Sequence, residues 1–156
     1  MRAVVQRVNS ARVVVDSEVA GEIGRGLLVY VGVARGDTPA EAAWLANKLA
    51  GIRLFPGDRT QGDGAEGARG MERSILDIGG AVLLVSQFTL LADTRKGRRP
   101  SFFEAAPPED AVPLLDTLAS ELRGRGIEVA TGRFGAHMLV TSENDGPVTI
   151  VLESRS

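Results

Sequence analysis

The chain has 156 residues, 44% of them hydrophobic and 24% charged, which is the size and composition of one ordinary globular domain. It has no cysteine, which excludes disulfides and thiolate chemistry, and its formal net charge of −2 excludes a surface that attracts nucleic acid everywhere. Arg2 and Arg7 interrupt the first residues, so no signal peptide is predicted, and no apolar stretch is long enough to span a bilayer. We therefore expect one cytoplasmic domain over residues 1–156, without membrane contact.

The first part of the chain is a series of β-branched and apolar runs separated by turn residues, which predicts a meander of strands. These strands are expected over residues 3–8, 11–15, 18–23 and 27–33. A helix follows, since Thr38 can cap it, Pro39 fits its first position and Glu41 completes a capping box. Its predicted buried face, at helical spacing, carries Ala42, Leu45, Leu49 and Ile52.

The middle of the chain contains a glycine-rich segment and then an apolar run. Residues 56–70 have mixed charges and no phosphate-binding pattern, which favours a solvated loop or a protruding hairpin. After Gly79 and Gly80, the continuous Val and Leu run from Ala81 to Val85 predicts a strand buried on both faces.

That strand ends in a polar segment, which is followed by a cluster of positive charge. Ser86, Gln87 and Thr89 surround Phe88, and the loop after them carries Arg95, Lys96, Arg98 and Arg99. A buried strand that delivers hydroxyl and amide groups next to cations can form a small polar site beside an anion site. The simpler alternative, a core strand followed by a solvated turn, stays open from these residues alone.

The last third of the chain predicts one more helix and three more strands. The helix should begin near residues 109–112, because Pro113 fits only its first turn. Its predicted buried face carries Leu114, Leu115, Leu118 and Leu122. Strands are expected over residues 127–131, 134–142 and 148–152, with a turn at residues 144–147. The expected fold class is therefore α+β, with a mainly antiparallel, barrel-like sheet and two covering helices.

Few residues of the chain are suited to catalysis. The single histidine, His137, falls on an expected strand and fits a surface position better than a catalytic triad. One histidine without cysteine does not predict a metal site, and no dinucleotide-binding pattern occurs, so we expect neither metal nor cofactor. Residues 144–147, Asn-Asp-Gly-Pro, predict a plain hairpin turn. In the alternative, a cis Gly146–Pro147 bond would hold two carbonyls in position to accept hydrogen bonds from an ammonium group.

Several stretches of the sequence are distinctive when taken together. They are residues 1–8 (MRAVVQRV), 26–29 (GLLV), 86–90 (SQFTL), 96–102 (KGRRPSF) and 144–149 (NDGPVT). With these motifs in this order, the chain resembles the D-aminoacyl-tRNA deacylases, also called D-tyrosyl-tRNA deacylases, over nearly its whole length. The resemblance implies a cytoplasmic homodimer without a cofactor that hydrolyses the ester between a D-amino acid and the terminal adenosine of tRNA. It also implies release of glycine from mischarged tRNA.

The resemblance further implies roles for individual residues. Gly146–Pro147 would be cis, and its carbonyls would bind the α-ammonium of the substrate in the partner's pocket, with Arg7 bracing the motif. The opposite wall, near the terminal adenosine and the ester, would consist of Ser86, Gln87, Phe88 and Thr89. The strand that helps to line the pocket would supply Phe134, Gly135, Ala136 and Met138. The residues in contact with tRNA would be Lys96, Arg98 and Arg99.

The resemblance leaves two mechanisms open. Thr89 could be the nucleophile, or the adenosine 2′-hydroxyl could assist while backbone N–H groups near Phe88 and Thr89 stabilise the oxyanion. We favour the second, because no base is evident beside Thr89. The chain departs from the family pattern in the longer loop of residues 56–70, in Glu72 and Arg73 after it, and in His137, where a polar residue such as Asp is more usual. A small-molecule esterase and a non-catalytic RNA-binding module are the competing hypotheses.

Overall fold

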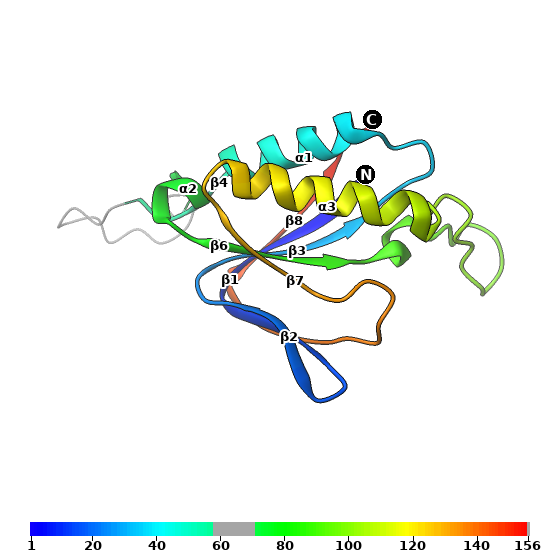
Figure 1. The fold of residues 1–156 in the computed structure, drawn as a ribbon, viewed down its shortest axis with the longest axis horizontal. Coiled ribbons are helices and arrows are strands. Elements are labelled where there is room, and N and C mark those ends of the chain that lie inside the picture. Colours follow the sequence, from blue (N-terminus) through cyan, green and yellow to red (C-terminus); the bar gives the residue numbers. More distant parts are fainter. Residues whose placement is uncertain (58–70, 156) are drawn as a thin grey trace.

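A six-stranded mixed sheet forms the centre of the structure (Figure 1), a computed structural model that describes residues 1–57 and 71–155. The strands of this sheet are β1 (Arg2–Val15), β2 (Glu18–Ile23), β3 (Gly26–Gly32), β6 (Ala81–Ser86), β7 (Glu128–Thr131) and β8 (Leu139–Glu153). β1 pairs antiparallel with β2, β3 and β8, while β6 lies parallel to β3 and to β7. The end strands β2 and β7 come close to each other, so the sheet is curled into a nearly closed barrel.

Two long helices pack against each other and cover one face of this sheet (Figure 1). The helices are α1 (Pro39–Gly51), α2 (Ile75–Ile78) and α3 (Pro108–Gly124), with a 3₁₀ helix, η2 (Phe88–Leu91), after β6. A separate small sheet consists of β4 (Arg53–Phe55) and β5 (Arg73–Ser74). The expected α+β class with a barrel-like sheet is confirmed. Besides the expected pair of covering helices, the structure has the single-turn helix α2, which Ser74 and Asp77 cap reciprocally. None of the helices in the described ranges has the length and apolar character needed to cross a membrane.

The sheet separates two apolar clusters. Leu27 of β3 and Leu84 of β6 face the helices and belong to one cluster with Leu49 of α1. Their neighbours Leu28 and Leu83 face the other way, into a second cluster. Burial of each such leucine stabilises the fold by about 1.5–3 kcal/mol. The prediction that the run after Gly80 is a strand buried on both faces is therefore confirmed.

Helix α1 begins as predicted. The Thr38 hydroxyl oxygen accepts a hydrogen bond from the Ala40 N–H at 3.3 Å, and the Thr38 N–H donates to Glu41 Oε2 at 2.6 Å. Hydrogen bonds from the Thr38 hydroxyl and N–H lower the pKa of the Glu41 carboxyl to about 2. Of the predicted apolar face, Ala42, Leu45 and Leu49 are buried, while Ile52 is the C-terminal cap and is half-buried.

Helix α3 begins earlier than predicted. Pro107 is its N-cap and Pro108 takes the first helical position, where a missing N–H is tolerated. Pro113 consequently lies inside the helix, on its exposed side, and the expectation that it lies in the first turn is wrong. The predicted apolar face is buried at Leu114, Leu118 and Leu122 and half-buried at Leu115.

The two longest strands, β1 and β8, differ most from the prediction. Asn9 and Ser10 do not separate two strands, because β1 continues through them. Likewise β8 runs from Leu139 to Glu153, so separate strands over 134–142 and 148–152 are wrong, and residues 144–147 are not a hairpin turn. The reason is that β8 stays paired with β1 on both sides of this segment. Most of the expected loop of residues 56–70, namely 58–70, lies outside the described residues.

Candidate functional site

The centre of the candidate site is a bulge in β8. Gln6 of β1 pairs with Thr149, but Val8, only two residues later, pairs with Asn144. The segment 145–148 of β8 therefore faces the single residue Arg7 of β1, and the surplus chain bulges out of the sheet. The Gly146–Pro147 peptide bond lies within this bulge and is cis.

The side chain of Arg7 holds the bulge in place through hydrogen bonds to backbone carbonyls. Its Nε donates to the Asp145 carbonyl oxygen at 3.0 Å, and its Nη1 donates to the Leu54 carbonyl oxygen of β4 at 2.7 Å. Arg7 is buried, so these bonds are shielded from water. The Asp145 carboxylate lies 3.4 Å from Arg7 Nε. One guanidinium therefore fixes the bulge to two other strands.

The bulge is also fixed by its own residues. The Asn144 side-chain oxygen accepts from the Val148 N–H at 2.8 Å, and its amide donates to the Thr149 hydroxyl at 3.1 Å. Gly146 has a φ of +137°, and a Cβ there would lie 2.8 Å from Val148 Cγ2 and 3.2 Å from Arg7 Nη2. The position therefore requires glycine. Gly146 and Pro147 are themselves exposed.

The polar segment after β6 forms a second part of the candidate site. β6 ends at Ser86, the Gln87 N–H donates to the Val31 carbonyl at 2.8 Å, and η2 begins at Phe88. The Gln87 side-chain amide donates to the Thr89 hydroxyl. Since an amide is not a base, this contact does not activate Thr89 as a nucleophile. Phe88 is 57% exposed.

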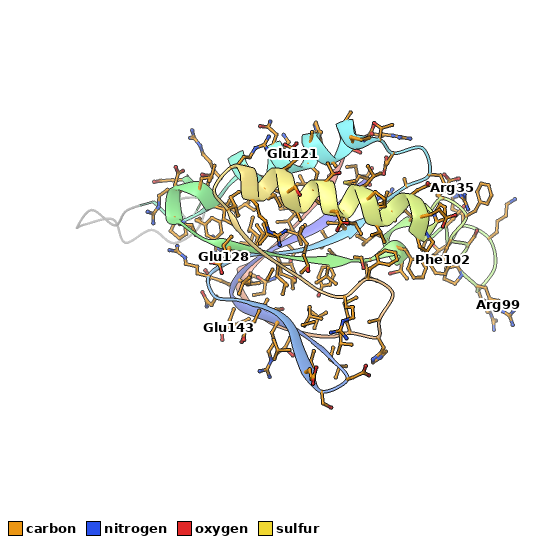
Figure 2. All side chains as sticks on the ribbon, viewed as in Figure 1. Arg35, Arg99, Phe102, Glu121, Glu128 and Glu143 are labelled. Atoms are coloured by element: carbon orange, nitrogen blue, oxygen red, sulfur yellow. The ribbon has the colours of Figure 1, made fainter. Side chains whose placement is uncertain are left out.

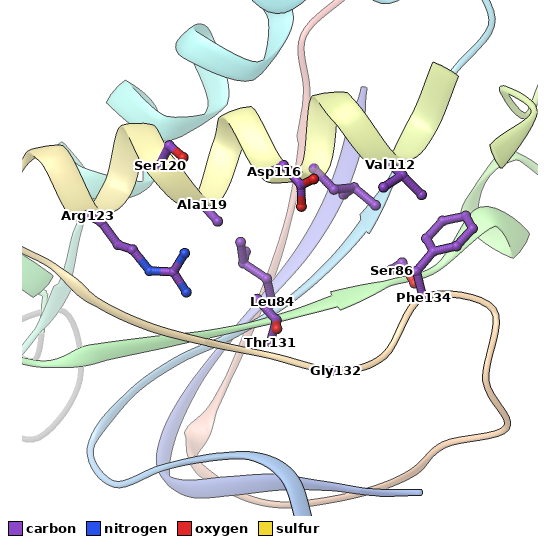
Figure 3. A pocket seen from close by; sticks show the side chains of 11 residues that line it. Leu84, Ser86, Val112, Asp116, Ala119, Ser120, Arg123, Thr131, Gly132 and Phe134 are labelled. Atoms are coloured by element: carbon purple, nitrogen blue, oxygen red, sulfur yellow. The ribbon is translucent and has the colours of Figure 1, made fainter. Parts of the chain in front are cut away.

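A cavity of about 360 Å³ lies between α3 and the strands β6 and β7 (Figure 3). Ser86 and Phe134 lie at one end of it, and Arg123 of α3 lies at the other. Ser86 and Phe134 are thus the residues proposed from the sequence that line this cavity. Gly146 and Pro147 do not line it. The structure therefore brings Ser86 and Phe134 together at one cavity, and no residue of the β8 bulge lines that cavity.

Residues 134–138 form a loop before β8 rather than the expected strand. Gly135 has a φ of +75°, which a strand residue does not adopt, and the Ala136 N–H turns back to the Arg133 carbonyl at 3.2 Å. Met138 is half-buried and packs against the second apolar cluster. His137 is exposed on this loop, so its predicted place on a strand is wrong.

The loop of residues 93–101, here called the basic loop, carries four cations. It is closed at its base and exposed at its tip. Asp93 and Ser101 exchange backbone hydrogen bonds at 2.8 and 2.9 Å. The Arg95 guanidinium donates to both carboxylate oxygens of Asp93, which lowers the pKa of Asp93 to about 2. The exposed cations beyond this pair are Lys96, Arg98 and Arg99.

Sequence reasoning missed three polar residues that line the cavity: Asp116, Ser120 and Arg123 of α3. Their spacing of four and three positions puts them on one face of the helix, and that pattern was available in the sequence. The Leu54 carbonyl that holds Arg7 carries no comparable signal, because every residue has a carbonyl. No group of three or more His, Asp or Glu side chains suited to a metal ion occurs among the described residues.

The comparisons with known proteins agree with the motifs of the sequence. The family model described as D-Tyr-tRNA(Tyr) deacylase matches residues 4–153. The chain belongs to this family. It is 58% identical over 154 residues to the D-aminoacyl-tRNA deacylase of Roseiflexus sp. (strain RS-1), covering 99% of this chain and 94% of that protein. It is 51% identical over 154 residues to the D-aminoacyl-tRNA deacylase of Thermotoga petrophila, with 99% and 97% coverage.

Solved structures share the fold of this deacylase family member over its whole length. A protein described as c-Myc DNA Unwinding Element Binding Protein superposes with a TM-score of 0.87 at 38% identity and covers 100% of both chains. A probable eukaryotic D-amino acid tRNA deacylase superposes with a TM-score of 0.79 at 19% identity, with 97% of each chain covered, and this second likeness concerns the fold alone. The sequence-based assignment to an ester hydrolase of the D-aminoacyl-tRNA deacylase type is thus confirmed.

Proposed function

We propose that this chain hydrolyses the ester that joins a D-amino acid, or glycine, to the 3′-terminal adenosine of tRNA, and that it acts in the cytoplasm. Membership of the deacylase family supports the substrate class. The observation that carries the proposal is the β8 bulge, which Arg7 fixes to two other strands. A fixed backbone is what chiral recognition needs, because a mobile loop would adapt to either hand of the substrate.

The proposal includes a homodimer in which the Gly146–Pro147 segment of one subunit enters the pocket of the other. Both residues are exposed in the single chain. Leu139 and Val151 of β8 are 61% and 60% exposed, although both are large apolar residues. An exposed apolar strand that carries the bulge is suited to contact with a second copy of the chain.

The reaction uses backbone groups and the substrate's own hydroxyl. Water attacks the ester carbonyl carbon and loses a proton, and the bond between that carbon and the ribose 3′-oxygen breaks. The 3′-oxygen takes up a proton, and a D-amino acid and free tRNA leave. The N–H groups of Phe88 and Thr89 stand at the start of η2, where a helix has no internal acceptors, and they stabilise the oxyanion. The adenosine 2′-hydroxyl assists proton transfer. Ser86 and Gln87 complete this wall, and Thr89 is a pocket residue rather than the nucleophile.

Selection for the D form follows from exclusion of the L form. The carbonyls of Gly146 and Pro147 accept hydrogen bonds from the α-ammonium, and the ester lies against the wall of Ser86 to Thr89. A D side chain then points to solvent, whereas an L side chain meets the bulge. The loop that supplies Phe134, Gly135, Ala136 and Met138 borders the pocket. This geometry is indifferent to which D side chain is present.

The basic loop contacts the acceptor end of the tRNA. Lys96, Arg98 and Arg99 are exposed on it and are suited to phosphate contacts. The net charge of −2 limits such contacts to this part of the surface. Binding of tRNA should therefore be weak and should fall as salt is added.

The deciding experiment compares release of amino acid from D-Tyr-tRNA and L-Tyr-tRNA with a metal chelator present. We expect rapid release from the D form and a rate for the L form close to that without enzyme. Equal release from both would overturn the chiral role of Gly146–Pro147 and favour a general esterase. RNA binding without release from either would favour a binding module.

A further inference from the structure

An aromatic ring and a guanidinium are held together beside the basic loop, and the site described above does not use them. Phe103 is 71% exposed, and the Arg35 guanidinium lies 5.1 Å from the centre of its ring. Arg35 Nε donates to the Phe103 carbonyl oxygen at 2.5 Å, and the Arg35 N–H donates to the Glu104 carbonyl at 2.9 Å. Backbone and side-chain contacts thus hold this pair in place, although its two residues are 68 positions apart.

The pair lies next to the candidate site. The ring of Phe102 meets the ring of Phe88 edge to face, with 5.2 Å between their centres. Phe103 is therefore the immediate neighbour of a residue that touches the wall of Ser86 to Thr89. Figure 2 shows Arg35, Phe102 and Arg99 together at one end of the molecule.

The charge around Phe103 indicates the kind of partner. Residues 93–104 carry four cations and two carboxylates, while the whole chain has a net charge of −2. One of these carboxylates, that of Asp93, is already paired with Arg95. A symmetric contact between two copies of the chain at this patch would bring like charges together, which costs free energy. Exposed aromatic rings among cations are instead the surface that single-stranded nucleic acid uses, with bases stacked on the rings and phosphates near the cations.

We propose that Phe103, supported by Arg35, stacks against a base in the single-stranded 3′ end of the tRNA, just before the nucleotide that carries the amino acid. The proposal rests on the function proposed above. Stacking on the free face of Phe103 would direct the backbone of these nucleotides past the exposed cations Lys96, Arg98 and Arg99. The pair would then position the substrate without touching the ester.

Shortened substrates separate this role from that of the pocket. D-tyrosyl-adenosine contains the ester and the last nucleoside, whereas a D-tyrosyl CCA trinucleotide also contains the two preceding bases. We expect Phe103→Ala to raise KM for the trinucleotide and for D-Tyr-tRNA about tenfold, which is the usual effect of losing one stacked base. KM for D-tyrosyl-adenosine and kcat for all three substrates should stay unchanged, and Phe103→Trp should restore KM.

Trp44→Ala is the matched control, because Trp44 is also a partly exposed ring beside a cation, with Lys48 Nζ 5.9 Å from its centre, but lies on α1. It should leave all three KM values unchanged. Equal values for wild type and Phe103→Ala on the trinucleotide, or an equal loss on D-tyrosyl-adenosine, would overturn the stacking role. A change of native mass in Phe103→Ala would instead identify the ring as a contact between subunits. Failure of the proposed function is distinct, since the wild type itself would then not hydrolyse D-Tyr-tRNA.

Discussion

Arg7 connects three strands through one buried side chain, and this requires the shape of a guanidinium. Arg7 belongs to β1. Its Nη1 donates to the Leu54 carbonyl of β4, and its Nε donates to the Asp145 carbonyl of β8. A lysine has one ammonium at the end of a flexible stem and does not offer the same planar fork. The identity of residue 7 therefore controls the geometry of the Gly146–Pro147 segment.

Replacement of Arg7 should affect both stability and activity. Arg7→Met leaves the buried Leu54 carbonyl without this donor, and we expect a loss of about 1–3 kcal/mol in the free energy of unfolding. We expect kcat/KM for D-Tyr-tRNA to fall at least about tenfold, because the bulge loses its support. Thermal unfolding and steady-state kinetics measure the two effects. Asp145→Asn is the control: it keeps the carbonyl acceptor and removes an ion pair whose carboxylate is 43% exposed, so it should be nearly neutral.

Substitution of Gly146 gives a second test of the role of the β8 bulge. Gly146→Ala puts a Cβ at a φ of +137° and 2.8 Å from Val148 Cγ2, so the bulge must shift. The strained backbone should cost about 1–3 kcal/mol of stability, and activity on D-Tyr-tRNA should fall more than stability explains. Gly124→Ala, at a position with no atom within 4 Å of the added Cβ, controls for the loss of a glycine. Normal activity of Gly146→Ala would contradict the role of this backbone in the pocket.

At the scale of single elements, local signals and long-range pairing determine different parts of the fold. The start of α1 was predictable because the capping box of Thr38 and Glu41 lies within one turn. The turn signal of residues 144–147 failed, because pairing with β1 keeps β8 continuous and converts the surplus residues into a bulge. Gly146 and Pro147 were recognised from the motif, but the bulge depends on a strand far away in sequence. No local pattern could have predicted it.

The capping box of α1 also predicts a dependence on pH. The pKa of Glu41 is lowered from 4.5 to about 2 in the folded chain, so the charged carboxylate stabilises the fold above pH 4.5. This stabilisation is lost as the pH falls from 4.5 towards 2. Wild type should therefore melt at a higher temperature than Glu41→Gln at pH 7, and the difference should shrink as the pH falls through about 2. Glu128→Gln, on the exposed side of β7, is the control. A difference that stays constant between pH 7 and pH 2 would rule out the carboxylate as its source.

In the whole molecule, the two parts of the proposed site lie on different surfaces of one chain. The cavity with Ser86 and Phe134 and the bulge with Gly146 occupy different parts of the described chain. A site that combines them therefore requires the second copy that the proposed homodimer supplies. The fold class and the covering helices were predictable from hydrophobic patterns, whereas this division of the site between two surfaces was implied only by the family resemblance.

Mixing two inactive variants tests the shared site. Gly146→Val damages the bulge, and Ser86→Phe fills the cavity, so each homodimer should be inactive. If each site combines the two surfaces across the dimer, exchange of subunits creates one intact site in every mixed dimer. A random mixture should then recover about a quarter of wild-type activity on D-Tyr-tRNA. Native mass confirms that both variants still assemble. No recovery from a mixture that has exchanged subunits would mean that each chain carries its own complete site.

The antiparallel pairing of β1 with β8 has a consequence for the time at which the site forms. The hydrogen bond between Arg7 and Asp145 joins residues 138 positions apart, whereas the contacts within α1 join neighbours in sequence and form far sooner. Closing so long a loop is entropically costly and slow. During synthesis, the sheet and the helices can begin to pack while β8 has yet to leave the ribosome. A nascent chain therefore lacks the β8 bulge, and under the proposed mechanism ester hydrolysis begins only once the last strand has joined the first.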